Sequence, residues 1–171
     1  MGDPLKIIRR AAMTVSLDGV DMGYTNGGQE VNREQEEFEV MVDQELSPVA
    51  ADIIGEKITI SVVFAESSKE NLAVYYNAVN TGAVPSTITG NFGGTTTIQG
   101  GQLILDTIKT VTISGTAHKI RFTFYDVYAK PNGSPKYAKG AIAGVPLKFT
   151  CLAQTANSEG SRLGKYEYIA I

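Results

Sequence analysis

The chain of 171 residues contains little of what catalytic, disulfide-bonded or membrane-spanning proteins need. Its one cysteine, Cys151, excludes a disulfide within the chain. Its one histidine, His118, falls in a predicted turn and lacks the two or three further ligands that a zinc site requires. No apolar run approaches the length of a membrane span, and residues 1–10 lack the apolar stretch of a signal peptide. We therefore expect synthesis in a cytosol.

The charge balance narrows the possible partners further. The formal net charge is −3 at pH 7. A protein that binds nucleic acid without regard to sequence needs a basic stripe that displaces counterions from the phosphates, and the chain has none. We expect neither sequence-independent nucleic-acid binding nor a membrane partner.

No group of residues has the pattern of a catalytic site. A serine or cysteine triad would have to use His118 as its base, and no serine lies in a nucleophile-elbow motif. Cys151 falls on the apolar side of a predicted strand, which indicates a buried, unreactive thiol. The acidic residues between positions 30 and 45 lie along an extended segment, whereas calcium loops are closely bent. We expect no catalytic residues, no metal, no cofactor and no enzymatic activity.

Glycine and strand-forming residues are abundant. There are 18 glycines, and Val, Ile, Thr, Tyr and Phe dominate the patterned segments, which favours an all-β core. Strands are expected at residues 13–17, 20–25, 110–114, 119–129, 144–154 and 162–171, with a tight hairpin turn at Asp18 and Gly19. The sequence predicts one mainly β domain over residues 1–171, a β-sandwich or barrel with one flanking α-helix, an N-terminal arm at residues 1–11 and a long protruding β-hairpin.

This hairpin spans residues 29–66 in two alternating limbs. Between them, residues 47–55 contain a cap, a proline and a glycine, which predict a single helical turn at the tip. The apolar residues expected on one face of the ribbon are Phe38, Val40, Val42, Ile58, Ile60 and Val62.

An isolated two-stranded ribbon is only marginally stable in water, so two alternatives stay open. Either the hairpin lies on its own domain as an acidic edge that resists aggregation, or it covers another subunit. For the second alternative the expected contact residues are Phe38, Val40, Met41, Val42, Leu46, Ile53, Ile54, Ile58 and Ile60. The charges expected to pair between subunits are Glu34, Glu36, Glu37, Glu39, Lys6, Arg9 and Arg10.

A helix is predicted at residues 67–81. Ser67 and Glu70 have the spacing of a capping box, and Gly82 supplies the expected stop. The predicted buried stripe comprises Leu72, Tyr75, Tyr76 and Val79. Residues 86–101, rich in Gly and Thr, lack the Gly-Lys-Ser/Thr ending of a phosphate loop and predict two short strands.

Several motifs, taken in order, resemble the major tail tube proteins of tailed bacteriophages. They are LDGVDMGYTNGG at residues 17–28, the acidic limb with VDQ at 42–44, IGEKITI at 54–60 and AESSKENLA at 65–73. The resemblance covers residues 17–79, and beyond them it consists only of the all-β layout.

The resemblance implies a structural virion protein. Members of the family form rings of six subunits that stack into a hollow tube, through which DNA passes from the capsid to the host. It implies synthesis in the host cytoplasm and a place in the tail of the virion. The implied partners are copies of the chain, terminator and baseplate or tip proteins, a sheath and a tape measure, with DNA as cargo that is not specifically bound.

Two other functions stay open. One is a related tube component, such as a secretion-system tube ring, a tail-terminus protein or a baseplate-hub protein. The other is a monomeric β-barrel binding module.

The physics of assembly is consistent with a tube. A ring of subunits that pair at their strand edges has no open edge, and ring stacking is a heterologous contact that propagates into a filament.

Overall fold

The computed structural model describes residues 13–41, 43, 47–81, 87, 89–91, 100–108, 110–135, 144–158 and 160–171. They form a mainly β structure with one flanking helix and a long protruding hairpin, which confirms the predicted fold class. No helix in these ranges is long and apolar enough to span a membrane. The elements are β1 (Met13–Leu17), β2 (Val20–Asp21), β3 (Thr25–Val40), β4 (Ala50–Phe64), α1 (Lys69–Tyr76), β5 (Val79–Thr81), β6 (Thr89–Asn91), β7 (Gly100–Thr107), β8 (Val111–Ile113), β9 (Thr116–Pro131), β10 (Val145–Cys151) and β11 (Gly164–Ala170).

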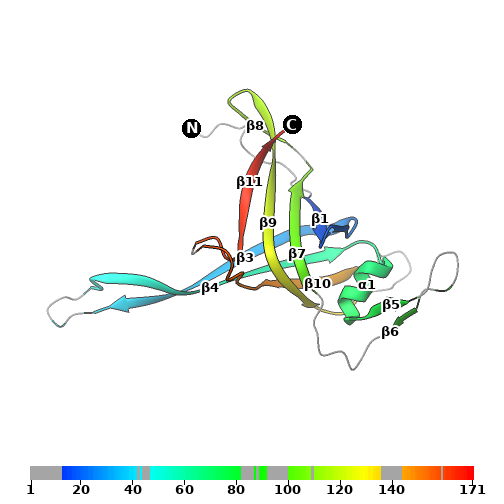
Figure 1. Ribbon diagram of the computed structural model, residues 1–171, viewed down its shortest axis with the longest axis horizontal. Coiled ribbons are helices and arrows are strands. Elements are labelled where there is room, and N and C mark those ends of the chain that lie inside the picture. Colours follow the sequence, from blue (N-terminus) through cyan, green and yellow to red (C-terminus); the bar gives the residue numbers. More distant parts are fainter. Residues whose placement is uncertain are drawn as a thin grey trace.

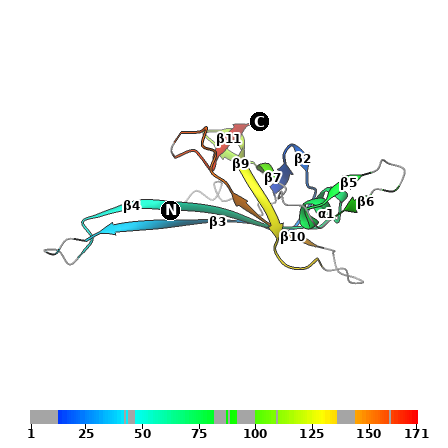
Figure 2. The same ribbon diagram turned by 60° about the horizontal axis from the view of Figure 1, so that its bottom comes forward.

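Three projections leave a common centre (Figure 1). The β3–β4 hairpin reaches out to the left, and α1 with the β5–β6 pair lies on the right. The third projection, called the stem here, consists of β8, β11 and the first half of β9. In the turned view, the hairpin still extends well away from the rest of the molecule (Figure 2).

The strand β9 holds the main sheet together. The sheet runs in the order β2-β1-β7-β9-β10-β4-β3, and β8 and β11 also pair with β9. Along one edge β9 pairs with β11 and then β10, and along the other with β8 and then β7.

Two glycines permit close approach to the backbone of β9: a Cβ on Gly100 would lie 2.0 Å from the Val127 carbonyl oxygen, and one on Gly164 would lie 2.5 Å from that of Thr123. Side chains at either position would collide with β9.

The core lies inside the curl of this sheet. The largest fully buried side chains include Phe64 of β4, Phe149 of β10 and Leu105 of β7. The two ends of the sheet approach each other, where the Gln29 amide nitrogen on β3 donates to the Met13 carbonyl oxygen at 3.1 Å. Part of the predicted arm, namely the second half of β4, therefore contributes to the core of its own domain.

The predicted turn between β1 and β2 is confirmed. Asp18 and Gly19 have φ angles of 50° and 79°, both in the left-handed region. Two successive left-handed residues are typical of the two-residue type I′ turn, whose twist matches that of the flanking strands.

The helix is shorter than predicted and is capped by other residues. Its N-cap is Ser68, not Ser67, and the Ser68 hydroxyl accepts from the Asn71 amide at 3.2 Å. It ends at the C-cap Asn77, whose φ of 49° is left-handed. Asparagine tolerates this conformation better than most residues, so the helix ends before the predicted stop at Gly82, which lies outside the described residues.

The predicted apolar stripe of the helix is only half right, since Leu72 and Tyr75 are partly buried and pack against the core. Tyr76 and Val79 are exposed, and the buried positions of α1 are Asn71, Ala73 and Val74. The Asn71 side-chain nitrogen donates to the carbonyl oxygens of Met22, at 3.0 Å, and Glu66, at 2.9 Å. A buried amide thus joins the start of the helix to the chain that leads into β3.

Two predicted local structures are replaced by strands. Residues 50–55 belong to β4, so the expected helical turn at the hairpin tip is wrong there. The turn expected at residues 115–118 lies at Ser114 and Gly115, both left-handed, so His118 is part of β9.

Candidate subunit interface

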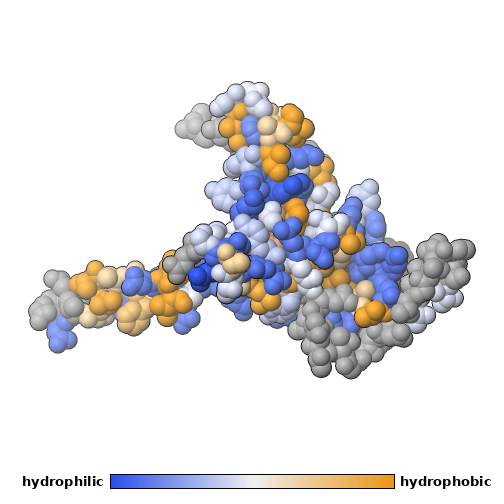
Figure 3. Space-filling model, in the orientation of Figure 1, coloured by the Kyte–Doolittle hydropathy of each residue, from blue (hydrophilic) through white to orange (hydrophobic). Residues whose placement is uncertain are grey.

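The β3–β4 hairpin passes from core to solvent along its length. Ile60 is fully buried, Ile58 is half-buried against the core, and beyond them most of the described side chains are exposed. We call the outer part, residues 36–41 and 47–55, the distal arm; apolar surface covers much of it in Figure 3. Its exposed apolar side chains are Phe38 (56% exposed), Met41 (58%), Val49 (53%), Ile53 (58%) and Ile54 (61%).

This division corrects the contact set expected from the sequence. Ile60 packs in its own core at 0% exposure, so its expected contact with a second subunit is wrong. Its burial follows from its position in the sheet, where β10 lies beside β4 and Phe149 is opposite Ile60. Val40 is half-buried, and Val42 and Leu46 lie outside the described residues.

A β-bulge divides the hairpin. Glu36 is opposite Gly55, but the next residue, Glu37, is opposite Ile53, so Ile54 has no partner across the ribbon. A bulge inserts one residue into one strand and increases the local twist. The distal arm is therefore turned relative to the part of the hairpin that joins the core.

The two limbs place their apolar residues on different faces. Ile58 is opposite Arg33, so these two side chains share a face. Phe38 is five positions after Arg33 on an alternating strand and lies on the other face, where Asp52 is opposite it. The prediction that Phe38 and Val40 share a face with Ile58 and Ile60 is wrong, because cross-strand register sets the faces as well as alternation.

The acidic side chains of β3 are exposed. The described ion pair of the hairpin joins Arg33 to Glu56 across the two strands. The Asn32 amide nitrogen donates to Glu34 at 3.1 Å. Glu36, Glu37 and Glu39 are in solvent as well. The basic residues expected to meet them, Lys6, Arg9 and Arg10, lie outside the described residues.

The stem offers a second apolar surface. Tyr166 and Tyr168 of β11 are opposite Phe122 and Ile120 of β9, and Phe122 is opposite the buried Leu105 of β7. The two tyrosines thus continue the core face of the sheet beyond the core, where they are 67% and 51% exposed. The outer edge of β11 pairs with no strand among the described residues. The pairing register therefore places both tyrosines on the core face of the sheet.

The opposite face of the stem carries acidic and basic side chains in equal number. The Arg121 guanidinium donates to both carboxylate oxygens of Asp106, at 2.7 and 2.6 Å, and this hydrogen bonding raises the pKa of Arg121. On the other side of Arg121 lies Glu167, which accepts from Lys165 at 2.9 Å. Two acids and two bases form a row across β7, β9 and β11 that presents no excess of one sign.

A groove of about 690 Å³ lies between the hairpin and the connection from β10 to β11. The hairpin contributes Ile53, Ile54 and Ile58, and the connection contributes Arg162 and Leu163. The inner face of the distal arm therefore continues into a recess on the body whose lining is both polar and apolar.

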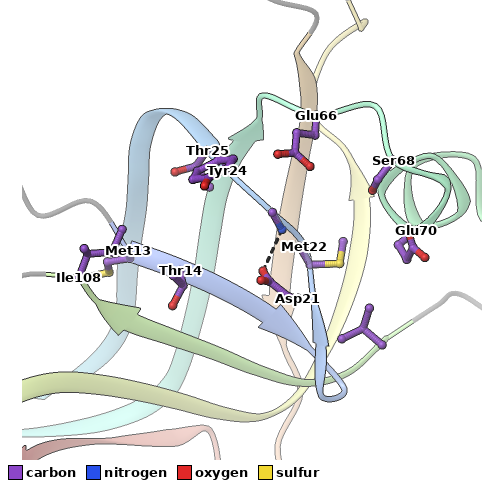
Figure 4. A pocket seen from close by; sticks show the side chains of 12 residues that line it. Met13, Thr14, Asp21, Met22, Tyr24, Thr25, Glu66, Ser68, Glu70 and Ile108 are labelled. Carbon is purple, nitrogen blue, oxygen red and sulfur yellow. Dashed lines mark hydrogen bonds between the residues drawn. The ribbon is translucent and has the colours of Figure 1, made fainter.

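A second hollow, of about 570 Å³, lies beside the β1–β2 hairpin (Figure 4). Met13 and Ile108 are at one end of it, and Ser68 and Glu70 of the helix region are at the other. The Gly23 amide donates to Asp21 at 2.9 Å, which is the dashed line in the figure. Its lining is mainly apolar in area and includes the carboxylates Asp21, Glu66 and Glu70.

The groups singled out for chemistry lie apart. His118 Nδ1 is 2.9 Å from the Thr116 carbonyl oxygen, in a strand of the stem. Cys151 is buried at the end of β10, and burial raises the pKa of its thiol to about 12. No three His, Cys, Asp or Glu side chains gather as a metal site within the described ranges.

A scan against protein-family models finds no match for the chain, and a search of curated proteins also finds none.

Proposed function

We propose that this protein is a structural subunit that assembles with copies of itself into stacked rings, forming a tube of the kind built by the major tail tube proteins of tailed bacteriophages. The observation that carries the proposal is the distal arm, which extends beyond the core with five exposed apolar side chains. The sequence resemblance of residues 17–79 supplies the kind of assembly and its role as a conduit for DNA.

The two faces of the distal arm both favour contact with other subunits. Phe38 projects from one face, and Ile53, opposite Glu37, projects from the other. A ribbon that lay flat on its own domain would cover only one of these faces. Burying an apolar side chain of this size contributes about 1.5–3 kcal/mol, so the partly exposed residues together favour association by several kcal/mol.

The stem supports lateral assembly. The free edge of β11 can accept a strand from a neighbouring copy, which would pair the peptide groups that are now at the edge. Tyr166 and Tyr168 would then be covered by the neighbour on the face that continues the core. Lateral pairing closes a ring, and the arm provides the heterologous contact that stacks one ring on the next.

The charge distribution suits a conduit for DNA. The net charge is −3, and the ion-paired row on the stem has equal numbers of acids and bases. A wall without a basic stripe would not retain the phosphates of passing DNA.

The test is size-exclusion chromatography and negative-stain imaging of the purified chain and of a variant with a shortened arm. In the variant, residues 37–54 are replaced by Asn-Gly, a sequence suited to a two-residue hairpin turn between Glu36 and Gly55. The retained pairs Arg33–Ile58 and Val31–Ile60 keep the proximal hairpin in the core. We expect tubes from the intact chain and a folded but unassembled variant.

Each other outcome has a defined meaning. Normal tubes from the shortened variant would contradict the role of the arm. Discrete rings from the intact chain would indicate a terminus or hub component, and a stable monomer would indicate a binding module. Val79→Ser is the matched control, because Val79 is exposed to a similar degree, 62%, but lies on β5 rather than on the arm.

A further inference from the structure

One face of the distal arm presents an aromatic side chain beside two carboxylates. Glu36 and Phe38 share this face because they are two positions apart on β3, and Asp52 is opposite Phe38 on β4. All three side chains are exposed, and neither carboxylate has an ion pair among the described residues. We call this surface the Phe38 face. A surface that combines an apolar hollow with positive charge would match it.

The body carries positive charge on the side of the sheet that faces away from the core. Lys130 of β9 is directly opposite Lys148 of β10, and the two form what we call the lysine pair. They point away from the core because their neighbours along the strands, Ala129 and Phe149, are buried in it. Like charges directly opposite each other weaken the pairing of two strands. Neither lysine has an ion pair in the described part of the chain, so an incoming carboxylate would relieve their repulsion.

A hollow of about 370 Å³ lies beside the lysine pair. The apolar side chains in its lining are Val63 of β4 and Pro146 of β10, which are opposite each other. Pro146 is two positions before Lys148 and therefore on the same face of the sheet. The Gly133 carbonyl oxygen, at the border of the hollow, accepts from the Tyr75 hydroxyl of α1 at 2.8 Å. The hollow is thus held in shape by the helix, with two cations next to it.

We infer that the Phe38 face of one copy docks on this surface of a second copy, with Phe38 in the hollow and both carboxylates beside the lysine pair. The inference rests on the proposed function, because it names the surface that the arm of a neighbouring copy contacts. The arm cannot reach this surface on its own chain. Glu30 is opposite Ser61, in the same row as the lysine pair, and Glu36 is six positions further along β3, about 20 Å away.

The twist of the hairpin favours this contact between copies of equal orientation. At the base of the hairpin, Glu30 is on the same side of the sheet as the lysine pair. In Figure 1 the strands β3 and β4 cross between the base and the distal arm, so the view shows one face of the ribbon at the base and the other on the arm. Strong twist is typical of two-stranded ribbons, and the bulge at Ile54 increases it. The Phe38 face is therefore turned away from the side on which the lysine pair of its own chain lies.

The larger hollows of the body suit the Phe38 face less well. The hollow of Figure 4 is lined by the carboxylates of Asp21, Glu66 and Glu70 and would repel an acidic ribbon. The groove beside the connection from β10 to β11 is lined in part by Ile53 and Ile54 of the arm itself. Charge and position therefore both favour the hollow beside the lysine pair.

Cross-linking tests the contact directly. A carbodiimide joins lysines to carboxylates without a spacer, and a mixture of isotopically heavy and light chains separates links between chains from links within one. In the assembled protein we expect heavy–light links from Lys130 or Lys148 to Glu36 or Asp52. Lys57 is directly opposite Glu34 on the hairpin, so a link between these two within one chain is the internal control.

Charge exchange is an independent test. The lysine variant combines Lys130→Glu with Lys148→Glu, and the arm variant combines Glu36→Lys with Asp52→Lys. Each variant should raise the concentration needed for assembly at least about tenfold, because like charges then meet at the contact. The chain with all four substitutions has opposite charges there again and should assemble within about threefold of the concentration of the intact chain.

The matched control separates the local contact from net charge. It adds Glu66→Lys and Glu70→Lys to the lysine variant, which restores the net charge at the hollow of Figure 4 rather than on the arm. This chain should assemble as poorly as the lysine variant. Urea denaturation of each variant shows that it is folded, which we expect because the four substituted positions of the contact are exposed or half-buried.

The outcomes separate this contact from the proposed function. Discrete rings with the expected heavy–light links would support the contact and contradict the tube. Tubes from the intact chain without those links, or four substitutions that fail to restore assembly, would contradict the contact alone. Restored assembly in the matched control would also contradict it, because net charge would then explain the effect. An intact chain that stays monomeric would contradict both.

Discussion

The double substitution Ile53→Thr and Ile54→Thr is the sharpest test of the distal arm. Threonine keeps the β-branched side chain that favours a strand, so the substitution changes apolar surface and not strand preference. Both isoleucines are about three-fifths exposed, at 58% and 61%, so neither contributes much to the core of its own domain. We expect the free energy of unfolding of the unassembled chain to change by less than about 0.5 kcal/mol.

The effect on assembly follows from the surface lost. Each replacement removes two carbons, at about 0.8 kcal/mol per buried carbon, and about three-fifths of that surface is available for burial by a partner. The loss is about 1 kcal/mol per residue, or about 2 kcal/mol per arm. Since about 1.4 kcal/mol corresponds to a factor of ten, the concentration needed for assembly should rise about 30-fold.

Two measurements separate assembly from stability. Light scattering across a dilution series gives the concentration at which polymer first forms, and urea denaturation of the dilute chain gives the free energy of unfolding. Val79→Ser should leave both the assembly concentration and the free energy of unfolding nearly unchanged. An unaltered assembly concentration would refute the reasoning, and so would a large loss of stability, which would mean that both isoleucines pack on their own domain.

Three further predictions concern the body. Asn71→Ala should lower the free energy of unfolding by about 2–4 kcal/mol in urea denaturation, because the buried bond to the Met22 carbonyl oxygen and the partly buried bond to that of Glu66 are both lost. The exposed Asn80→Ala should cost less than about 0.5 kcal/mol. Asp106→Asn should cost about 0.5–1 kcal/mol, since the pair with Arg121 is partly exposed, and the difference should shrink in about 1 M salt. Burial raises the pKa of Cys151 from 9.0 to about 12, so a thiol reagent at pH 8 should label only the unfolded protein.

The last two predictions have clear contrary results. An effect of Asp106→Asn that stays the same in high salt would indicate a packing contribution rather than an electrostatic one. For Cys151 the thiolate forms more readily in the unfolded chain, so the free energy of unfolding should fall as the pH rises from 9.0 towards 12. Labelling of the folded protein at the rate of a free thiol would contradict its burial.

The strand pattern could be predicted from the sequence because alternation is local. The turn at Asp18 and Gly19 and the strands β1, β10 and β11 are evident in a few residues each. The helix was misplaced because two adjacent serines, Ser67 and Ser68, can both cap it, and only the packed structure selects the second. Asn77 ended it early through a backbone angle that the sequence does not display.

The candidate interface was only partly predictable. Phe38, Ile53 and Ile54 are exposed, but Ile60 is buried because β10 lies against β4. That contact joins residues about 90 positions apart, which periodicity within one segment cannot reveal. The bulge at Ile54 was equally hidden, because it is a mismatch between two strands and leaves each limb alternating normally.

The continuity of β9 bears on how the molecule carries a mechanical load. Its sixteen residues pass without interruption from the tip of the stem into the body, with partner strands on both edges. A force applied at the stem therefore travels along one covalent backbone, and detaching the stem means shearing many hydrogen bonds at once rather than peeling them singly. Pulling on the two ends of β9 in a single-molecule experiment should show one abrupt rupture for the stem and body together.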